Sequence, residues 1–227
     1  MELWHVINHS IEGRDLFLDS QDYARFVHDL YEFNDSAPAG NAYRLFDASD
    51  VMDIVNPSSK KAHREMLVDI HGWTLMKDHY HLLLSERIEN GISMFLRKLN
   101  VGYANYVNQR YERKGTLCRG RTKKILIGSE SHSLYILHYL HLNPLDYLKC
   151  AQEWRLRSNG DIRSLKEALN YLNTYRWSSY LDYSWKKNFP SILTTSLFQD
   201  ALGNYNESLR EYLQDAEHDS LANLLLE

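Results

Sequence analysis

The stretch Leu75-Met76-Lys77-Asp78-His79-Tyr80-His81-Leu82-Leu83-Leu84 contains two apolar runs separated by a polar segment. Met66 to Met76 is predicted as a strand, and His79 to Ser85 as the next strand, so the two should pair as a hairpin. Side chains alternate between the two faces of a strand. His79 and His81 therefore point the same way and can reach one ion.

The elements around this hairpin follow from hydrophobic spacing and from breakers. They are a strand over Leu3–Ile7, a helix over Asp19–Phe33 capped by Ser20 or Asp22, a helix over Asn90–Tyr111, one or two strands within Leu117–Ile127 and a helix over Leu134–Leu142 closed by Pro144. This order predicts an α+β fold: a ferredoxin-like antiparallel sheet with helices packed on one face, plus a C-terminal helical extension.

The chain divides at about residue 150. Residues 1–150 are predicted to form the α+β domain, with an irregular insertion at about 35–64 that lacks a sustained period. Residues 151–227 are predicted as a helical extension packed on or near that domain. Its helical pieces are expected over Leu165–Leu172, Ser196–Leu202 and Glu207–Leu226.

Composition excludes several classes of protein. The two cysteines, Cys118 and Cys150, form no CxxC pattern, which argues for a reducing compartment and against a cysteine zinc site. No apolar run approaches the length of a membrane span, so we expect a cytoplasmic protein without a membrane partner. The oligomeric state is left open between monomer and homodimer.

Positive charge is concentrated in one segment, although the whole chain has a net charge of −4. Between Glu86 and Ile125, ten Lys and Arg stand against three acids, a local net charge of +7. Phosphate binding responds to such a local patch, whereas a solvated helix face is the plainer alternative. The predicted DNA contacts are Arg110, Arg113, Lys114, Arg119, Arg121, Lys123 and Lys124.

The two same-face histidines are candidate metal ligands, although a strand histidine more often lies in a core or at a surface. With oxygen donors completing the site, they suit Mg²⁺ or Mn²⁺ acting as a Lewis acid. Tyr139 and Asn143 lie four residues apart and share a face of the last predicted helix, a spacing that Pro144 makes approximate. His5 and His9 are placed near the sheet edge, and His71 facing a helix.

Two imidazoles, an amide oxygen and a phenol are sufficient for metal-assisted attack on a phosphodiester. A phenol is a poor nucleophile at neutral pH because its pKa is about 10. A metal on the scissile phosphate would stabilise the developing charge, and a phosphotyrosine bond would conserve the energy of the broken linkage. The residues thus favour an enzyme that cuts nucleic acid.

Four ordered motifs carry a resemblance to a known family. They are Met76-Lys77-Asp78-His79-Tyr80-His81, Gly115-Thr116-Leu117-Cys118-Arg119, Tyr139-Leu140-His141-Leu142-Asn143-Pro144 and Trp177-Ser178-Ser179-Tyr180. The chain resembles the single-tyrosine HUH-class transposases of the IS200-like superfamily, in particular REP-associated tyrosine transposases. It departs from them at Lys77-Asp78, where the family has Pro-Asn, and at Asn8-His9-Ser10, where it has Arg-Gly-Asn.

The resemblance implies a role for each matched residue. His79 and His81 would bind the divalent metal, Asn143 would stand at the position of the third ligand, and Tyr139 would be the nucleophile. The implied substrate is single-stranded DNA folded into a REP-like hairpin, cut through a 5′-phosphotyrosine intermediate.

Two other functions stay open. One is a domesticated relative that grips hairpin DNA without cutting it, against which the intact His79, His81, Tyr139 and Asn143 set argues. The other is an unrelated metal hydrolase that uses the two histidines and has no role on DNA.

Overall fold

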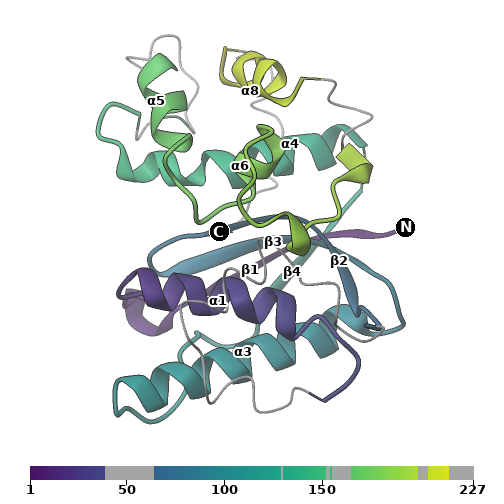
Figure 1. Cartoon of the computed structure of the whole chain (residues 1–227), viewed down its shortest axis with the longest axis vertical. Helices are drawn as coiled ribbons and strands as arrows, with labels where there is room; N and C mark the ends of the chain where they lie inside the picture. The colour runs from purple at the N-terminus through teal and green to yellow at the C-terminus, as the bar shows by residue number, and fades with distance from the viewer. Residues whose placement is uncertain (39–63, 129, 152–153, 155–164, 199–203, 215–227) are drawn as a thin grey trace.

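The computed structural model describes residues 1–38, 64–128, 130–151, 154, 165–198 and 204–214 (Figure 1). Most of the predicted insertion at 35–64 lies outside the described residues. So do the ends of the helices expected over Ser196–Leu202 and Glu207–Leu226. The division into residues 1–150 and 151–227 stays a prediction.

The described elements follow the predicted order. The strands are β1 (Leu3–His9), β2 (Val68–Leu75), β3 (His79–Glu86) and β4 (Lys123–Ile127). The α-helices are α1 (Ser20–Glu32), α3 (Gly91–Arg110), α4 (Glu130–Leu142), α5 (Leu165–Leu172), α6 (Tyr180–Tyr183) and α8 (Tyr205–Gln214). Three short 3₁₀ turns are η1 (Ile11–Gly13), η3 (Asn143–Tyr147) and η4 (Pro190–Ile192).

The four described strands form one antiparallel sheet in the order β2-β3-β1-β4. β2 and β3 pair as the predicted hairpin, whose turn is closed by a 2.8 Å hydrogen bond from Met76 N to His79 O. The order of strands and helices along the chain, with this strand order, is the ferredoxin-like arrangement, so the predicted α+β fold class is confirmed. β1 and β3 are interior strands, and β2 and β4 are the edges.

Helices cover both faces of the sheet. α1 and α3 lie below it in Figure 1, whereas α4, α5, α6 and α8 lie above it. The expectation of helices on one face is corrected by α4, which packs on β2 and β3 from the opposite side. The reason is that the strands are apolar on both faces: Leu82 joins the core under α1 and α3, and its neighbour Leu83 joins the core under α4.

Several element boundaries differ from the prediction: β1 continues to His9 instead of ending at Ile7, and α4 begins at Glu130 instead of Leu134. Asp19, not Ser20 or Asp22, caps α1, because its carboxylate accepts hydrogen bonds from Gln21 N and Asp22 N at 2.9 and 3.1 Å. Within the expected strand region Leu117–Ile127, only β4 is a strand, and Cys118 forms an isolated bridge with Ser10. None of the described helices has the length and apolar character needed to cross a bilayer.

Candidate functional site

A row of histidines crosses the sheet face that lies under α4. In the β1–β3 ladder His9 stands opposite His79, and Ile7 stands opposite His81. Because side chains alternate, His5 and His9 share the face of His79 and His81. The His9 and His79 rings stack with their centroids 4.7 Å apart, and the ring centroids of His79 and His81 are 4.9 Å apart. The predicted pair of histidines is therefore part of a larger cluster.

His5 lies next to His81 inside the fold. Its Nε2 is 3.0 Å from His81 Nδ1, and both side chains are buried. Burial lowers the pKa of His5 to about 3, assisted by the positive charges of His132 and Lys123. His5 is thus neutral at physiological pH and holds the ring of His81 in place. β1, which carries His5 and His9, is an interior strand next to the edge strand β4.

Tyr139 reaches this row from α4. Its ring centroid is 5.8 Å from that of His81 and 6.2 Å from that of His5, both edge to face. The rings of Tyr139 and Trp154 also lie close together, with centroids 5.6 Å apart. The side chain is buried, with 4% of its surface exposed. The structure thus brings together the two histidines and the tyrosine that the sequence singled out.

The end of α4 is fixed by a proline and a threonine. Pro144 has no N–H, so the carbonyl of Leu140 lacks its helical donor. The hydroxyl of Thr74 on β2 supplies one at 2.7 Å. Thr74 stands beside His81 in the β2–β3 ladder. This bond ties the end of the helix that carries Tyr139 to β2, which is the neighbour of the strand that carries His79 and His81.

Asn143 lies just past the end of α4 and is fully buried. Its side-chain amide donates a 2.8 Å hydrogen bond to the carbonyl oxygen of Tyr139, four residues earlier. The bond satisfies a terminal helix carbonyl, which is the role of a capping residue. A role for Asn143 as third metal ligand stays a prediction.

The cluster has donor atoms suited to a metal ion. One ligand atom each from His9, Asp78 and His79 lie within 4.8 Å of one another. Asp78 Oδ1 is 2.7 Å from His79 Nδ1, and this hydrogen bond from His79 lowers the pKa of Asp78. His79 Nε2 is buried and has no hydrogen-bond partner among the described residues. A carboxylate on one ring nitrogen with the other nitrogen left open is the usual arrangement of a metal-binding histidine.

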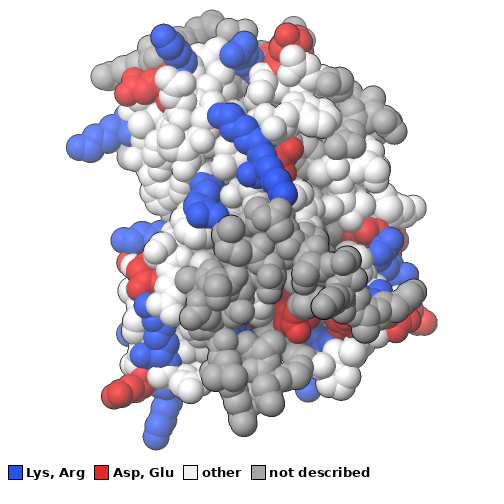
Figure 2. All heavy atoms as spheres, in the orientation of Figure 1, with Lys and Arg blue, Asp and Glu red and all other residues white. Residues whose placement is uncertain are grey.

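The predicted DNA-binding residues lie in different environments: some are paired within the fold and others are exposed. The guanidinium of Arg110 pairs with Asp19 and Asp22 at 2.6 and 2.5 Å, so it is occupied within the fold. Lys123 and Lys124 are exposed on β4, and the backbone N–H of Arg119 donates to His9 O at 2.8 Å. On the face shown in Figure 2, Lys and Arg occur next to Asp and Glu in both halves of the molecule.

Sequence reasoning missed His5, His9 and Asp78 as members of the site. The period-two alternation of His5, Ile7 and His9 was the available signal, because it puts both histidines on one face of β1. That signal becomes useful only once β1 is known to pair with β3.

Comparison with known proteins adds to this geometry. Residues 43–123 match the model of the family described as "Transposase IS200 like". This segment includes His79 and His81 and ends before Tyr139, and over it the resemblance to IS200-like transposases is confirmed. A solved structure of a REP-associated tyrosine transposase bound to a REP hairpin is similar at a TM-score of 0.44, with 10% identity over 86% of each chain. No curated protein matches the sequence.

Proposed function

We propose that this chain, in which residues 43–123 match the IS200-like transposase family, is a metal-dependent tyrosine DNA endonuclease and strand transferase. Its substrate would be a hairpin-forming single strand. One observation carries the proposal: the rings of Tyr139, His79 and His81 form one cluster between α4 and the sheet. The ring centroid of His81 lies 5.8 Å from that of Tyr139 and 4.9 Å from that of His79. We place the protein in the cytoplasm, in keeping with its two free cysteines.

His79 and His81 are the residues that would hold the divalent ion, Mg²⁺ or Mn²⁺. His9 lies close enough to His79 to add a nitrogen donor, and Asn143 is the third ligand that the family resemblance implies. When bound, the ion would supply Lewis-acid stabilisation of charge on the scissile phosphate. Asp78 and His5 would orient the rings of His79 and His81 through their Nδ1 atoms.

Tyr139 would carry the covalent step. Its hydroxyl oxygen forms a bond to the phosphorus while the bond from phosphorus to the 3′ oxygen breaks. The phenol proton passes to water, and the leaving 3′ oxygen takes up a proton to become a free 3′-hydroxyl. The 5′ end stays bound to Tyr139 as a phosphotyrosine, so a later attack by another 3′-hydroxyl rejoins DNA without ATP.

A second function is favoured by the burial of this tyrosine. With 4% of Tyr139 exposed and Trp154 against its ring, the residue offers a substrate little surface in this conformation. A protein that binds hairpin DNA without cutting it needs no access to this side chain. This is the domesticated relative that the sequence left open.

The test is formation of a covalent adduct. The wild-type protein, with labelled hairpin DNA and Mg²⁺ or Mn²⁺, is expected to give a protein–DNA species that survives denaturation. Tyr139→Phe removes the nucleophilic oxygen and should abolish the adduct while leaving DNA affinity within about two-fold. Tyr135→Phe is the matched control, since Tyr135 is another buried tyrosine of α4, and it should form the adduct.

Other outcomes of this experiment would support other functions. Binding without cleavage supports the DNA-binding relative, and cleavage without an adduct supports a hydrolase that uses the histidines with water. Titration of the protein with Mn²⁺ tests the metal ligands separately: His79→Ala should lose the binding that the wild type shows. Equal Mn²⁺ binding by His79→Ala would remove His79 from the site.

A further inference from the structure

The turn between β2 and β3 is fastened to the loop that follows β1. This turn, Lys77-Asp78, comes directly before His79, so its position decides where the first histidine of the pair lies. Lys77 O accepts from Leu16 N at 2.7 Å, and Asp78 O accepts from Ser10 N at 2.8 Å. The loop after β1 therefore fixes both carbonyl groups of the turn.

The backbone N–H of the turn is bound by a side chain from a third segment. Lys77 N donates to the hydroxyl oxygen of Tyr147 at 2.6 Å. Tyr147 is the last residue of η3, the 3₁₀ turn that follows α4 directly. This bond therefore connects the segment that continues the helix of Tyr139 to the turn that carries the histidines.

The hydroxyl of Tyr147 is a neutral acceptor. Burial of the phenol raises the pKa of Tyr147 to about 12, and the negative charges of Asp78 and Asp146 contribute to the rise. A protonated phenol can accept from a backbone N–H and still donate its own proton. The influence of Asp78 on this pKa also shows that the carboxylate that binds His79 lies near the hydroxyl.

A second bond joins the same two parts of the fold. The hydroxyl of Thr74 on β2 donates to Leu140 O near the end of α4 at 2.7 Å. Lys77 lies at the turn beyond Thr74, and Tyr147 lies beyond the end of α4. A single contact leaves rotation about itself free, whereas two separated contacts restrict it. The bond of Tyr147 therefore contributes orientation that the bond of Thr74 alone does not supply.

Movement of the turn would reach His79 through Asp78. Asp78 follows Lys77 in the chain, and its Oδ1 accepts from His79 Nδ1 at 2.7 Å. A carboxylate that orients a metal-binding histidine is worth about 10–100-fold in metal affinity. Tyr147 acts one residue further from the ion, so we expect a smaller effect from its loss.

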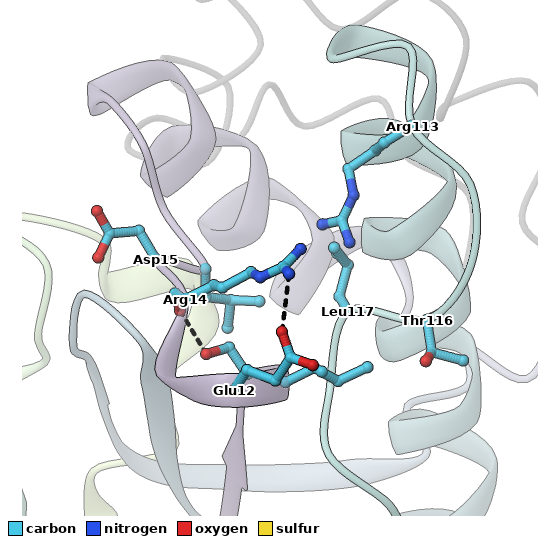
Figure 3. Close-up of a pocket in the computed structure, with 9 residues that line it drawn as sticks. Glu12, Arg14, Asp15, Arg113, Thr116 and Leu117 are labelled. Carbon is cyan, nitrogen blue, oxygen red and sulfur yellow. Dashed lines mark hydrogen bonds and ion pairs between the residues drawn. The ribbon is translucent and has the colours of Figure 1, made fainter.

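The two polar groups of Lys77 bind different segments. Its ammonium group pairs with Asp15 at 3.0 Å, and Asp15 points away from the small pocket between the loop after β1 and the loop after α3 (Figure 3). Its backbone N–H binds Tyr147. Proline, which the resembled family has at this position, has no N–H and needs no acceptor. Substitutions at position 77 can therefore remove the ammonium group with or without the N–H.

We propose that Tyr147 is a positioning residue of the candidate site. Through the N–H of Lys77 it holds Asp78 and His79 in a fixed position relative to the helix that carries Tyr139. This role rests on the proposed function, since it takes His79 as a metal ligand and Tyr139 as the nucleophile. Tyr147 itself contacts neither the ion nor the scissile phosphate in this role.

The hydrogen bond is tested first in the metal-free protein. Tyr147→Phe removes the acceptor and keeps the ring, so the amide of Lys77 should exchange with solvent about five-fold faster, the scale of one hydrogen bond. Tyr171→Phe is the matched control, because the rings of Tyr171 and Tyr147 both lie beside Tyr175, at 6.2 and 6.4 Å between centroids. It should leave this exchange rate unchanged. Equal exchange in the wild type and Tyr147→Phe would overturn the proposal.

Titration with Mn²⁺ then separates positioning from packing. Tyr147→Phe should weaken Mn²⁺ binding by about three- to ten-fold, and Tyr171→Phe should not. In a Lys77→Pro background, which lacks the N–H, adding Tyr147→Phe should change the affinity by less than about two-fold. In a Lys77→Ala background, which lacks only the ammonium group, Tyr147→Phe should keep its full effect.

The outcomes distinguish this role from the proposed function. Equal Mn²⁺ affinity of the wild type and Tyr147→Phe, or an equal loss in the Lys77→Pro background, would overturn the positioning role and leave the proposed function standing. A covalent adduct with hairpin DNA that survives Tyr139→Phe and disappears in Tyr147→Phe would make Tyr147 the nucleophile and overturn both. A wild type that neither binds Mn²⁺ nor forms an adduct would also overturn both.

Discussion

Arg110 joins the C-terminal end of α3 to the start of α1. Its guanidinium contacts Asp19 through both terminal nitrogen atoms, at 2.9 and 2.6 Å, and Asp22 at 2.5 Å. Asp22 is fully buried and also accepts from Tyr106 and Tyr111. A charged side chain with this many partners stabilises the fold, which leaves little of it for a DNA phosphate.

We therefore expect Arg110→Ala to destabilise the protein by about 1–3 kcal/mol, because it leaves the buried carboxylate of Asp22 without its cationic partner. The measurement is the free energy of unfolding in urea. Arg97→Ala, at an exposed position of the same helix, should change that energy by less than about 0.5 kcal/mol. Equal effects of the two substitutions would contradict this role for Arg110.

The packing of α1 on α3 depends on one close approach between the two helices. A Cβ built on Gly102 of α3 would lie 2.3 Å from the ring of Phe33, the residue that ends α1. Phe33 is buried in the core formed by these helices and the sheet. The glycine thus allows the two backbones to come together.

Gly102→Ala tests this contact. Alanine favours a helix over glycine by about 1 kcal/mol, whereas overpacking a core costs about 1–3 kcal/mol. We expect the clash to prevail and the melting temperature to fall. Gly128→Ala is the control, since a Cβ there meets nothing within 4 Å. A melting temperature raised by Gly102→Ala would show that Phe33 moves aside at little cost.

Local elements were predictable because their signals lie within a few residues. The hairpin of β2 and β3, the extent of α5 and the end of α4 at Pro144 all follow from short patterns. The partners of Arg110 are 88 and 91 residues away. Nothing in the sequence around Arg110 distinguishes a side chain that pairs with Asp22 from one that is free to bind a DNA phosphate.

At the scale of the whole molecule, the sheet separates two cores. One lies between the sheet and α1 with α3, and the other lies between the sheet and α4 with the C-terminal helices. The sequence indicated the strands but not that both faces would be covered. Only part of the histidine cluster was predictable from the sequence. His79 and His81 share a strand, so their common face follows from local alternation, whereas His5 is 76 residues from His81 in the sequence and meets it only in the folded sheet.

Buried histidines should make the stability of the whole fold sensitive to acid. His71 on β2 bonds Ser85 Oγ at 2.8 Å and Thr194 O at 3.1 Å, and burial lowers its pKa below the usual 6.5. Below about pH 6.5 this histidine binds a proton in the unfolded chain, whereas in the folded chain it stays neutral until the pH reaches the lowered pKa. Stability from this group is therefore present above about pH 6.5 and is lost as the pH falls through the lowered pKa.

His71→Gln should reduce the pH dependence of the unfolding free energy below pH 6.5. One proton contributes a slope of at most about 1.4 kcal/mol per pH unit. Urea unfolding of the wild type and the variant at several pH values measures the difference. Slopes that coincide would show that His71 takes up its proton as easily in the folded protein as in the unfolded chain.

The edge position of β4 affects how copies of this chain meet. An edge strand has backbone N–H and C=O groups without a neighbour, and these groups invite pairing with a strand of another molecule. On β4 the exposed side chains of Lys123 and Lys124 flank this edge. Two such strands brought together would place like charges side by side. The lysines predicted to attract DNA thus also disfavour continuation of the sheet from one molecule into the next, and with it one route to aggregation.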